Sequence, residues 1–230
     1  MSSCNSQHQR YGTSVNYLDD VLERQLLTID PKKIVDFGAG GGKNGKIVRR
    51  VLGDSVHVAA VEGFQPTAKM LQASGIYTEV CYGLIQDWLK NSTEHYDLAI
   101  FGDVLEHLTV SEIHWVMRKC LKRFGCIIVI VPLCDIFQLE SYGNKLEIHK
   151  SYITESFFNR YKPEEKHIKV GEHYTIMNVK IITNTKKQPF TLRRFGKKMI
   201  QPFIPILQPL GLALPLVRLL QLVGKMLRAK

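Results

Sequence analysis

An apolar run that stops in glycines constrains the fold of this chain more than any other feature. Residues 32–42 read KKIVDFGAGGG, in which a short β-branched stretch ends in a cluster of glycines. Residues 45–52, GKIVRRVL, follow with the apolar spacing of an amphipathic helix. The sequence therefore predicts a strand, a tight glycine turn and a helix in that order.

The same alternation recurs along the next hundred residues. Further strands are predicted at 57–62, 76–81, 96–102 and 126–132, and helices at 65–74 and 111–125. An earlier helix is expected from Ser14 to the residue before Pro31, with Ser14 or Thr13 as N-cap, and Ser111 and Gly125 are expected to cap and end the helix at 111–125. Residues 167–173 and 174–184 form a predicted antiparallel hairpin. Apolar strands alternating with helices indicate an α/β fold, a Rossmann-like, doubly wound, mostly parallel seven-stranded sheet.

Charge divides the chain into two parts. The 230 residues carry a formal net charge of +10, and residues 186–230 contain ten basic residues and no acid. The remainder is formally neutral, so the sequence predicts a globular domain over 1–185 and a basic tail over 186–230. A basic body that grips nucleic acid is disfavoured, and nucleic acid is not an expected partner.

The glycine turn excludes two common nucleotide-binding loops. A dinucleotide loop needs glycine where this chain has Lys43, and a P-loop needs glycine at Phe37 and Ser or Thr at Asn44. The pattern that fits is D-x-G-x-G-x-G, formed by Asp36, Gly38, Gly40 and Gly42. This pattern resembles motif I of the class I S-adenosylmethionine (SAM)-dependent methyltransferases, in particular the ubiquinone-biosynthesis O-methyltransferases and the methyltransferase types 11 and 12.

The resemblance implies a SAM site at the carboxyl ends of the strands. Glycines allow the backbone to pass close under a phosphate-free nucleoside, and Asp36 is suited to meet the cationic amino group of its methionine part. Glu62, 24 positions after Gly38, is expected to accept from the ribose hydroxyls. The resemblance also assigns Gln86 and Asp87 to the adenine and Asp103 to the cofactor, and Asp87 alone reads equally well as a helix cap.

A second set of residues follows the predicted strand at 96–102. Asp103, Glu106 and His107 resemble the D/E-x-x-E-H segment of the ubiquinone-biosynthesis enzymes and of the small-RNA terminal 2′-O-methyltransferases, and His149 follows later. In the small-RNA group such residues hold a divalent metal beside the hydroxyl that is methylated. Three roles stay open here: a metal site made by all four residues, catalysis by Glu106 with His107 or His149 as a metal-free base, and positioning of the cofactor.

The long connection from Pro132 to His149 is expected to form part of the acceptor pocket. Its candidate residues are Phe137, Tyr142, Gly143 and Asn144. The acceptor itself is not specified by these residues.

The tail combines an uncharged run at 199–217 with a predicted basic amphipathic helix from Leu216. Prolines and glycine in the run disfavour a straight membrane-spanning helix. The polar face of the helix is formed by Arg218, Gln221, Lys225 and Arg228. Such a helix suits an anionic membrane surface, although packing on the body or in a dimer, or contact with RNA phosphates, would also use it.

These observations predict a SAM-dependent methyltransferase acting on a hydroxyl of a lipid-linked, glycolipid, sugar or other small-metabolite acceptor at a membrane surface. The alternatives are an RNA 2′-O-methyltransferase with a metal-assisted site and a non-catalytic scaffold with the same fold. Five cysteines without a C-x-x-C pair, and an N-terminus without the apolar segment of a signal peptide, favour a cytoplasmic location. The basic tail adds a peripheral position on the cytoplasmic face of the membrane as an option. The sequence does not specify the oligomeric state.

Overall fold

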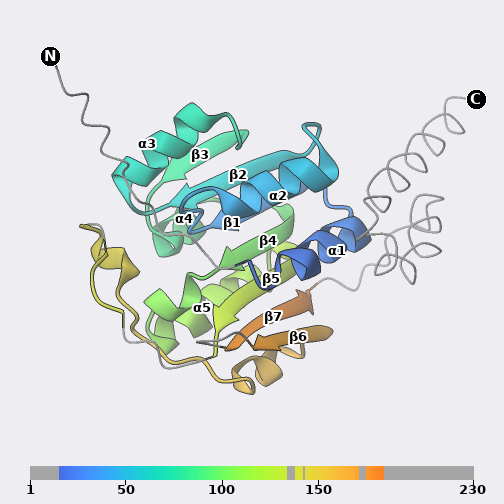
Figure 1. Cartoon of the computed structure of the whole chain (residues 1–230), viewed down its shortest axis with the longest axis vertical. Coiled ribbons are helices and arrows are strands. Elements are labelled where there is room, and N and C mark those ends of the chain that lie inside the picture. Colours follow the sequence, from blue (N-terminus) through green and yellow to red (C-terminus); the bar gives the residue numbers. More distant parts are fainter. Residues whose placement is uncertain (1–15, 134–137, 142, 171–174, 184–230) are drawn as a thin grey trace, which may run out of the picture.

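The computed structural model describes residues 16–133, 138–141, 143–170 and 175–183. They form a single sheet with helices on both of its faces (Figure 1). The strands are β1 (Lys33–Phe37), β2 (His57–Glu62), β3 (Glu79–Tyr82), β4 (Tyr96–Gly102), β5 (Phe124–Pro132), β6 (Glu165–Val170) and β7 (Thr175–Ile182). The α-helices are α1 (Asp19–Ile29), α2 (Lys43–Leu52), α3 (Gln65–Ser74), α4 (Ile85–Asn91) and α5 (Val110–Cys120), and the short 3₁₀ helices are η1 (Leu105–His107), η2 (Lys145–Glu147) and η3 (Phe157–Tyr161).

The strand order is β3-β2-β1-β4-β5-β7-β6, and the first five strands are parallel. β7 runs antiparallel to both β5 and β6, so β6 and β7 form the predicted closing hairpin. The doubly wound, seven-stranded sheet predicted from the sequence is thereby confirmed. The chain moves outward from β1 in one direction and then in the other from β4, which makes the β1–β4 boundary the switch point of the sheet.

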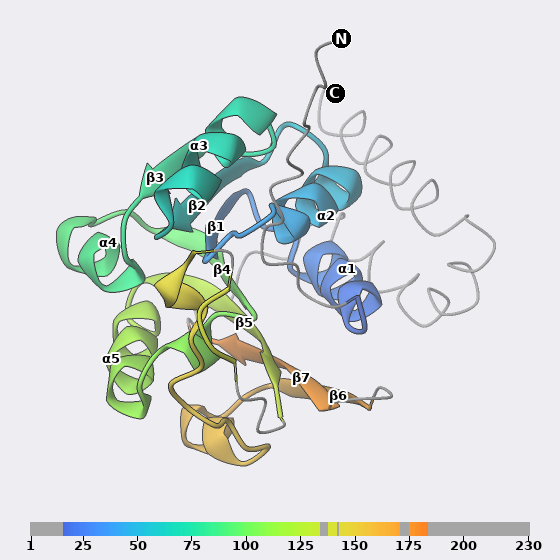
Figure 2. The same ribbon diagram turned by 60° about the vertical axis from the view of Figure 1, so that its left-hand side comes forward.

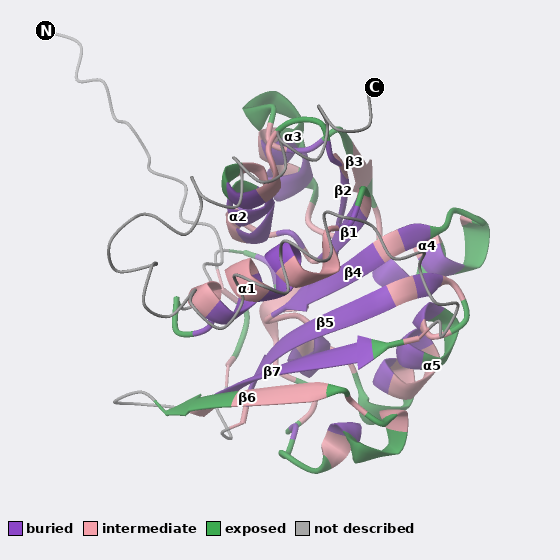
Figure 3. Ribbon diagram, turned by 90° about the vertical axis from the view of Figure 1, so that its right-hand side faces the viewer, coloured by how far each residue is buried: buried purple, intermediate pink, exposed green. Residues whose placement is uncertain are grey.

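Each face of the sheet has its own core. α1, α2 and α3 cover one face, and α4, α5 and η3 cover the other (Figure 2). Successive residues of β5 alternate between these cores, because Ile128 belongs to the first and Val129 to the second. β4, β5 and β7 are buried along most of their length, whereas β6 forms a more exposed edge (Figure 3).

The predicted boundaries of α5 are wrong at both ends, and capping explains the first of these differences. α5 begins after Thr109, not Ser111, because Thr109 and Glu112 form a reciprocal capping box. α5 ends at Cys120, since Phe124 and Gly125 already belong to β5. α1 begins at Asp19 with Leu18 as N-cap, and the expected caps Thr13 and Ser14 lie outside the described residues.

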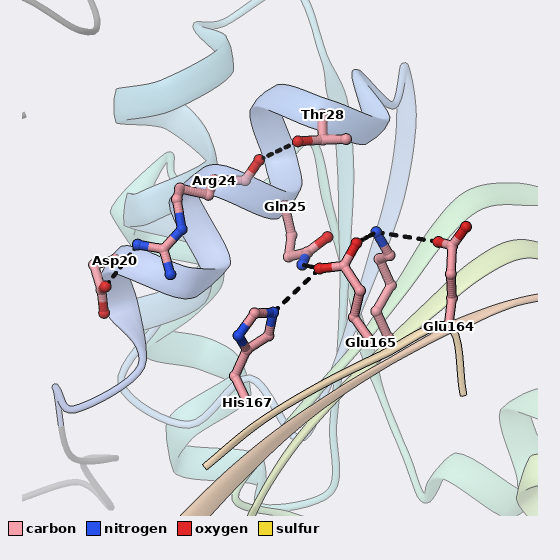
Figure 4. A network of polar contacts seen from close by, with 8 residues as sticks. Asp20, Arg24, Gln25, Thr28, Glu164, Glu165 and His167 are labelled. Atoms are coloured by element: carbon pink, nitrogen blue, oxygen red, sulfur yellow. Dashed lines mark hydrogen bonds and ion pairs between the residues drawn. The ribbon is translucent and has the colours of Figure 1, made fainter. Parts of the chain in front are cut away.

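A polar cluster joins α1 to the hairpin (Figure 4). Gln25 of α1 donates to Glu165 of β6 at 2.6 Å, and the same carboxylate accepts from the buried Lys180 of β7. Lys180 also pairs with Glu164 at 3.1 Å. These contacts fix the first helix against the antiparallel end of the sheet.

Within the part of the chain that the structure describes, no helix has both the length and the apolar character needed to cross a membrane. The predicted tail at 186–230 lies outside the described residues, as do Phe137 and Tyr142 of the expected acceptor pocket.

Candidate functional site

The loops that follow β1 and β4 meet at the switch point of the sheet. A Cβ atom placed on Gly38 would lie 2.4 Å from the Val104 side chain, and one placed on Gly102 would lie 2.5 Å from the Asn44 amide. Only glycine permits this close approach of the two loops. Parallel sheets of this type bind ligands at this position, so the candidate site begins here.

The glycine turn needs its glycines for backbone conformation. Gly38, Gly40 and Gly42 have φ angles of 64°, 48° and 75°, which side chains adopt only with strain. Gly42 is also the N-cap residue of α2, and no side chain caps that helix. The turn therefore presents bare backbone at the edge of the sheet, as the sequence predicted.

Asp36 lies beneath this turn and is buried. One carboxylate oxygen accepts from the Tyr77 hydroxyl at 2.7 Å, and the other accepts from the Asn44 amide at 3.1 Å. Burial raises the pKa of Asp36 to about 6, against the lowering effect of these two hydrogen bonds. In this arrangement the carboxylate joins β1 to the start of α2 and to Tyr77, and its predicted contact with a methionine amino group stays a prediction.

Glu62 closes the turn from the end of β2. Its side chain accepts from the backbone N–H of Gly40 at 2.9 Å and from that of Phe64 at 2.8 Å. Burial raises the pKa of this carboxyl, although the backbone donors oppose the rise. A carboxylate has room for about four hydrogen bonds, so Glu62 retains capacity for a ligand hydroxyl.

The structure places Gln86 and Asp87 in the first turn of α4, where their side chains have different partners. The Gln86 amide donates to Glu112 of α5 at 3.1 Å. Asp87 is exposed and pairs with Lys90 at 3.3 Å. Their predicted contacts with adenine are not tested by this arrangement.

The loop after β4 holds two acids close together. Asp103 adopts a φ of 49°, unusual for a residue with a side chain, and its N–H donates to Ile130 at 2.9 Å. Glu106 is buried, and its Oε2 atom has no hydrogen-bond partner within the described ranges. Burial first, and then the neighbouring charge of Asp103, hold the pKa of Glu106 well above its usual range.

His107 and His149 lie side by side next to Glu106. Their ring centroids are 4.9 Å apart in an edge-to-face arrangement. His107 Nδ1 lies 3.4 Å from the Ile148 carbonyl oxygen, which as an acceptor favours a proton on Nδ1 and a lone pair on Nε2. Burial, with His149 as a lesser cause, lowers the pKa of His107 to about 4. The His107 imidazole is therefore neutral at physiological pH.

Glu106, His107 and His149 also offer a candidate metal site. One donor atom from each residue lies within 4.8 Å of the others, and Asp103 is not a member of this group. A metal about 2.1 Å from each ligand holds its ligands at most about 4.2 Å apart. The donor chemistry therefore fits a divalent cation, with at most a small contraction of the set.

Sequence reasoning missed three residues of this region: Asn44, Tyr77 and Glu147. Asn44 lies two residues after Gly42, and a polar amide side chain so close to the glycine turn could have indicated a residue of the site. Tyr77 precedes β3 and reaches Asp36 across 41 positions, a contact without a local signature. Glu147 lies in η2, where Asn144 donates to its carboxylate at 3.1 Å.

Comparisons with known proteins identify the fold. No protein-family model matches the chain, and no curated sequence matches it. The N-terminal domain of EvdMO1, solved with SAH and D-fucose, superposes with a TM-score of 0.56 at 10% identity, covering 75% of this chain and 85% of that one. The plantazolicin methyltransferase BpumL in complex with SAH gives a TM-score of 0.53 at 13% identity over 73% of this chain and 83% of its own.

An O-methyltransferase family protein from Burkholderia thailandensis gives a TM-score of 0.55 at 12% identity. The match covers 73% of this chain but only 56% of that longer protein. The fold is thus the Rossmann-like fold of class I SAM-dependent methyltransferases, as predicted. The narrower likeness to the ubiquinone-biosynthesis enzymes is not confirmed.

Proposed function

We propose that this protein is a SAM-dependent methyltransferase that acts on a hydroxyl group. The observation that carries the proposal is the glycine turn at the switch point, closed by the buried Glu62 carboxylate on the Gly40 N–H. Acids surround this turn, and buried carboxylates there repel phosphate but favour a cationic, phosphate-free nucleoside. SAM has this chemistry.

The residues present fit the cofactor. Glu62 would accept from the ribose, the turn at Gly38–Gly42 would lie under the nucleoside, and Asp103 and Glu106 would balance positive charge. The buried Glu106 Oε2, which lacks a hydrogen-bond partner among the described residues, supports a ligand here. When bound, SAM supplies a methyl group whose C–S bond breaks as the C–O bond forms, with the bonding electrons remaining on sulfur.

His107 is the proposed base. A hydroxyl loses its proton as it gains a methyl group, and the neutral Nε2 atom can accept that proton. The Ile148 carbonyl would hold the ring through Nδ1, and the adjacent His149 would complete the acceptor side. Glu106 would position this pair.

For the acceptor, we propose a lipid-linked, glycolipid, sugar or other small-metabolite hydroxyl presented at a cytoplasmic membrane surface. The support is the sequence of the tail, which combines basic residues with leucines at amphipathic spacing. With such an acceptor, the formally neutral residues 1–185 would carry out the transfer, and the basic, apolar tail would bind the membrane surface that holds the acceptor.

The experiment that tests the proposal is SAM binding by calorimetry together with transfer of labelled methyl into a fractionated cell extract. Glu62→Ala should abolish both signals, whereas Glu79→Ala, at an exposed position in the next strand, should retain them. Label in the organic phase would support a lipid acceptor. A wild-type protein that binds no SAM would refute the proposal and favour a non-catalytic scaffold.

A second candidate is an RNA 2′-O-methyltransferase with a metal-assisted site. The grouping of Glu106, His107 and His149 donors within 4.8 Å favours it. A metal there would polarise the hydroxyl oxygen in place of a base. Label that enters RNA and is lost on chelation would select this candidate over the first.

A further inference from the structure

The outward side of α5 is basic. Its inner side packs into the core that α5 shares with α4 through buried apolar residues, which are Ile113, Val116, Met117 and Cys120. On the solvent side, Arg118 and Lys119 are exposed, and Lys122 is exposed in the turn that follows the helix. The one acid within α5, Glu112, belongs to the capping box at the start of the helix. The exposed part of α5 therefore presents cations.

η3 adds a fourth cation to this side, and Figure 2 shows η3 beside α5 at the periphery of the fold. The ring of His114 in α5 stacks on Phe157 with centroids 5.1 Å apart, and its Nδ1 atom contacts the Tyr161 hydroxyl. Arg160 Nη1 donates to His114 Nε2 at 2.9 Å, so this nitrogen holds no proton and the imidazole is neutral. Arg118 lies one turn after His114 on the same side of α5. Two guanidinium groups therefore lie next to one neutral ring.

The protein does not balance these charges with acids. In the described part of the chain, no carboxylate forms an ion pair with any of the four cations, which are Arg118, Lys119, Lys122 and Arg160. Residues 1–185 are formally neutral, so this basic side is a local concentration of charge within a neutral body. Like charges that the fold holds together repel one another, and an anion bound between them relieves the repulsion.

An aromatic ring lies among these cations. Trp115 is half-buried against the same core, and Lys119 Nζ lies 5.4 Å from the centre of its ring. Tryptophan next to basic residues is typical of surfaces that meet lipid headgroups. Single-stranded nucleic acid instead uses aromatic rings on which bases stack, and Lys119 covers a face of this ring. The combination therefore favours a lipid surface over RNA.

We propose that the basic side of α5 and η3 binds the phosphate groups of anionic phospholipids and lays this side of the body on the membrane. Four charges alone bind a membrane weakly, so this contact orients a body that the tail holds there. α5 begins three residues after His107, so this orientation keeps the candidate site beside the bilayer. The contact needs no cofactor, and it holds whether or not the protein transfers methyl groups.

The test uses the full chain without SAM and vesicles of phosphatidylcholine with phosphatidylserine. The double variant Arg118→Gln/Arg160→Gln removes two charges at exposed positions. Because each basic residue near an anionic surface contributes a factor of about five in affinity, the partition coefficient should fall about 5- to 30-fold. The matched control is Lys46→Gln/Lys69→Gln, which removes the same charge from exposed positions of α2 and α3 on the other face of the sheet and should leave the coefficient nearly unchanged.

A second measurement tests the orientation of the bound body. The chain has two tryptophans, Trp88 and Trp115, and Trp88 packs against Phe37 in the core. Brominated phosphatidylcholine in the vesicles should quench the fluorescence of the bound wild type, and Trp115→Phe should lose most of this quenching. Quenching that persists in Trp115→Phe would overturn the inference, as would equal partition coefficients for the wild type and the arginine variant or an equal fall for the control pair.

Two further arms separate the sources of phosphate. Inorganic phosphate added at constant ionic strength should not release the protein from the vesicles, and release would show a site for free phosphate instead of lipid. If the arginine variant lost binding to RNA but kept its binding to vesicles, RNA would replace lipid as the partner and the inference would be wrong. Methyl transfer is measured separately, so a protein that transfers methyl groups without this contact would refute the inference and leave the proposed activity standing.

Discussion

Asp36 is a buried acid whose protonation affects the stability of the unliganded protein. Its pKa in the folded state is about 6, above the ordinary value of 3.8, so the folded state holds this proton more tightly than the unfolded chain. The stabilisation is complete below about pH 4 and is lost as pH rises through about 6, at a cost on the order of 3 kcal/mol.

Asp36→Asn removes this titration and keeps groups able to bond with Asn44 and Tyr77. We expect the variant to gain stability relative to the wild type as pH rises from 5 to 8. Thermal unfolding of both proteins without cofactor at several pH values measures the difference. A difference that stays constant over this range would contradict the assignment.

If His107 is the base, the rate of methyl transfer should depend on pH in a way that its lowered pKa determines. Because burial lowers its pKa to about 4, the imidazole stays neutral above about pH 5 and should impose no loss of rate there. His107→Gln should lower kcat by about 10²- to 10⁴-fold and leave SAM affinity nearly unchanged. His114→Gln serves as control, since His114 lies on α5 against Tyr161 and Arg160. A proportional loss of SAM affinity in His107→Gln would contradict the role as base.

At the scale of elements, the contacts between α1 and the β6–β7 hairpin should contribute to the free energy of unfolding. Lys180 is buried, which by itself lowers its pKa, but its ion pairs with Glu164 and Glu165 outweigh burial and leave the pKa raised. Glu165→Ala leaves the buried ammonium half-compensated and frees Gln25, so we expect a loss of about 1–3 kcal/mol in unfolding free energy, less than for a fully buried pair.

Lys169→Ala is the matched control, because its pair with Asp20 at 2.6 Å joins the same two elements across a more exposed surface. Its loss should stay below about 1 kcal/mol. Chemical denaturation of both variants compares the two values. Equal losses of unfolding free energy in the two variants would show that burial of Lys180 does not determine how strongly the Glu165 ion pair stabilises the fold.

At the same scale, strands buried on both faces were more predictable than the ends of α5, whereas the strand predicted at 76–81 is wrong at its start, since β3 spans Glu79–Tyr82. The apolar runs at 57–62 and 96–102 coincide with β2 and β4, because strands buried on both faces have continuous apolar sequences. The start of α5 was missed because both Thr109 and Ser111 are good N-caps, and the reciprocal bond with Glu112 selects Thr109. The end of α5 was missed because Phe124 suits either a helix or the strand it begins.

The candidate site was predictable where it depends on one local pattern. The glycines and Glu62 lie together as expected, since parallel strands bring their carboxyl ends to one edge. The place of Tyr77 depends on a contact with Asp36 across 41 positions, which composition and spacing do not reveal. Asp36 lies at the expected edge of the sheet, near the carboxyl end of β1. Its side chain forms hydrogen bonds with Asn44 and Tyr77, which the sequence pattern did not indicate.

At the scale of the whole molecule, the separation of charge predicts how the protein meets a membrane. Residues 1–185 are formally neutral, and the excess of +10 lies in residues 186–230. Each basic residue near an anionic surface adds about 1 kcal/mol of attraction, and salt weakens this attraction by screening. Screening does not weaken the free energy gained by burying leucines in the lipid.

We therefore expect the full chain to float with vesicles of phosphatidylcholine and phosphatidylserine, and a chain ending at Thr185 to remain in the lower fractions. Vesicles of phosphatidylcholine alone should retain less protein, and raised salt should reduce flotation in part because the apolar contribution persists. Equal flotation of the two chains would refute membrane binding by the tail. Full release by salt would instead identify an electrostatic contact without insertion, since apolar burial does not respond to screening in this way.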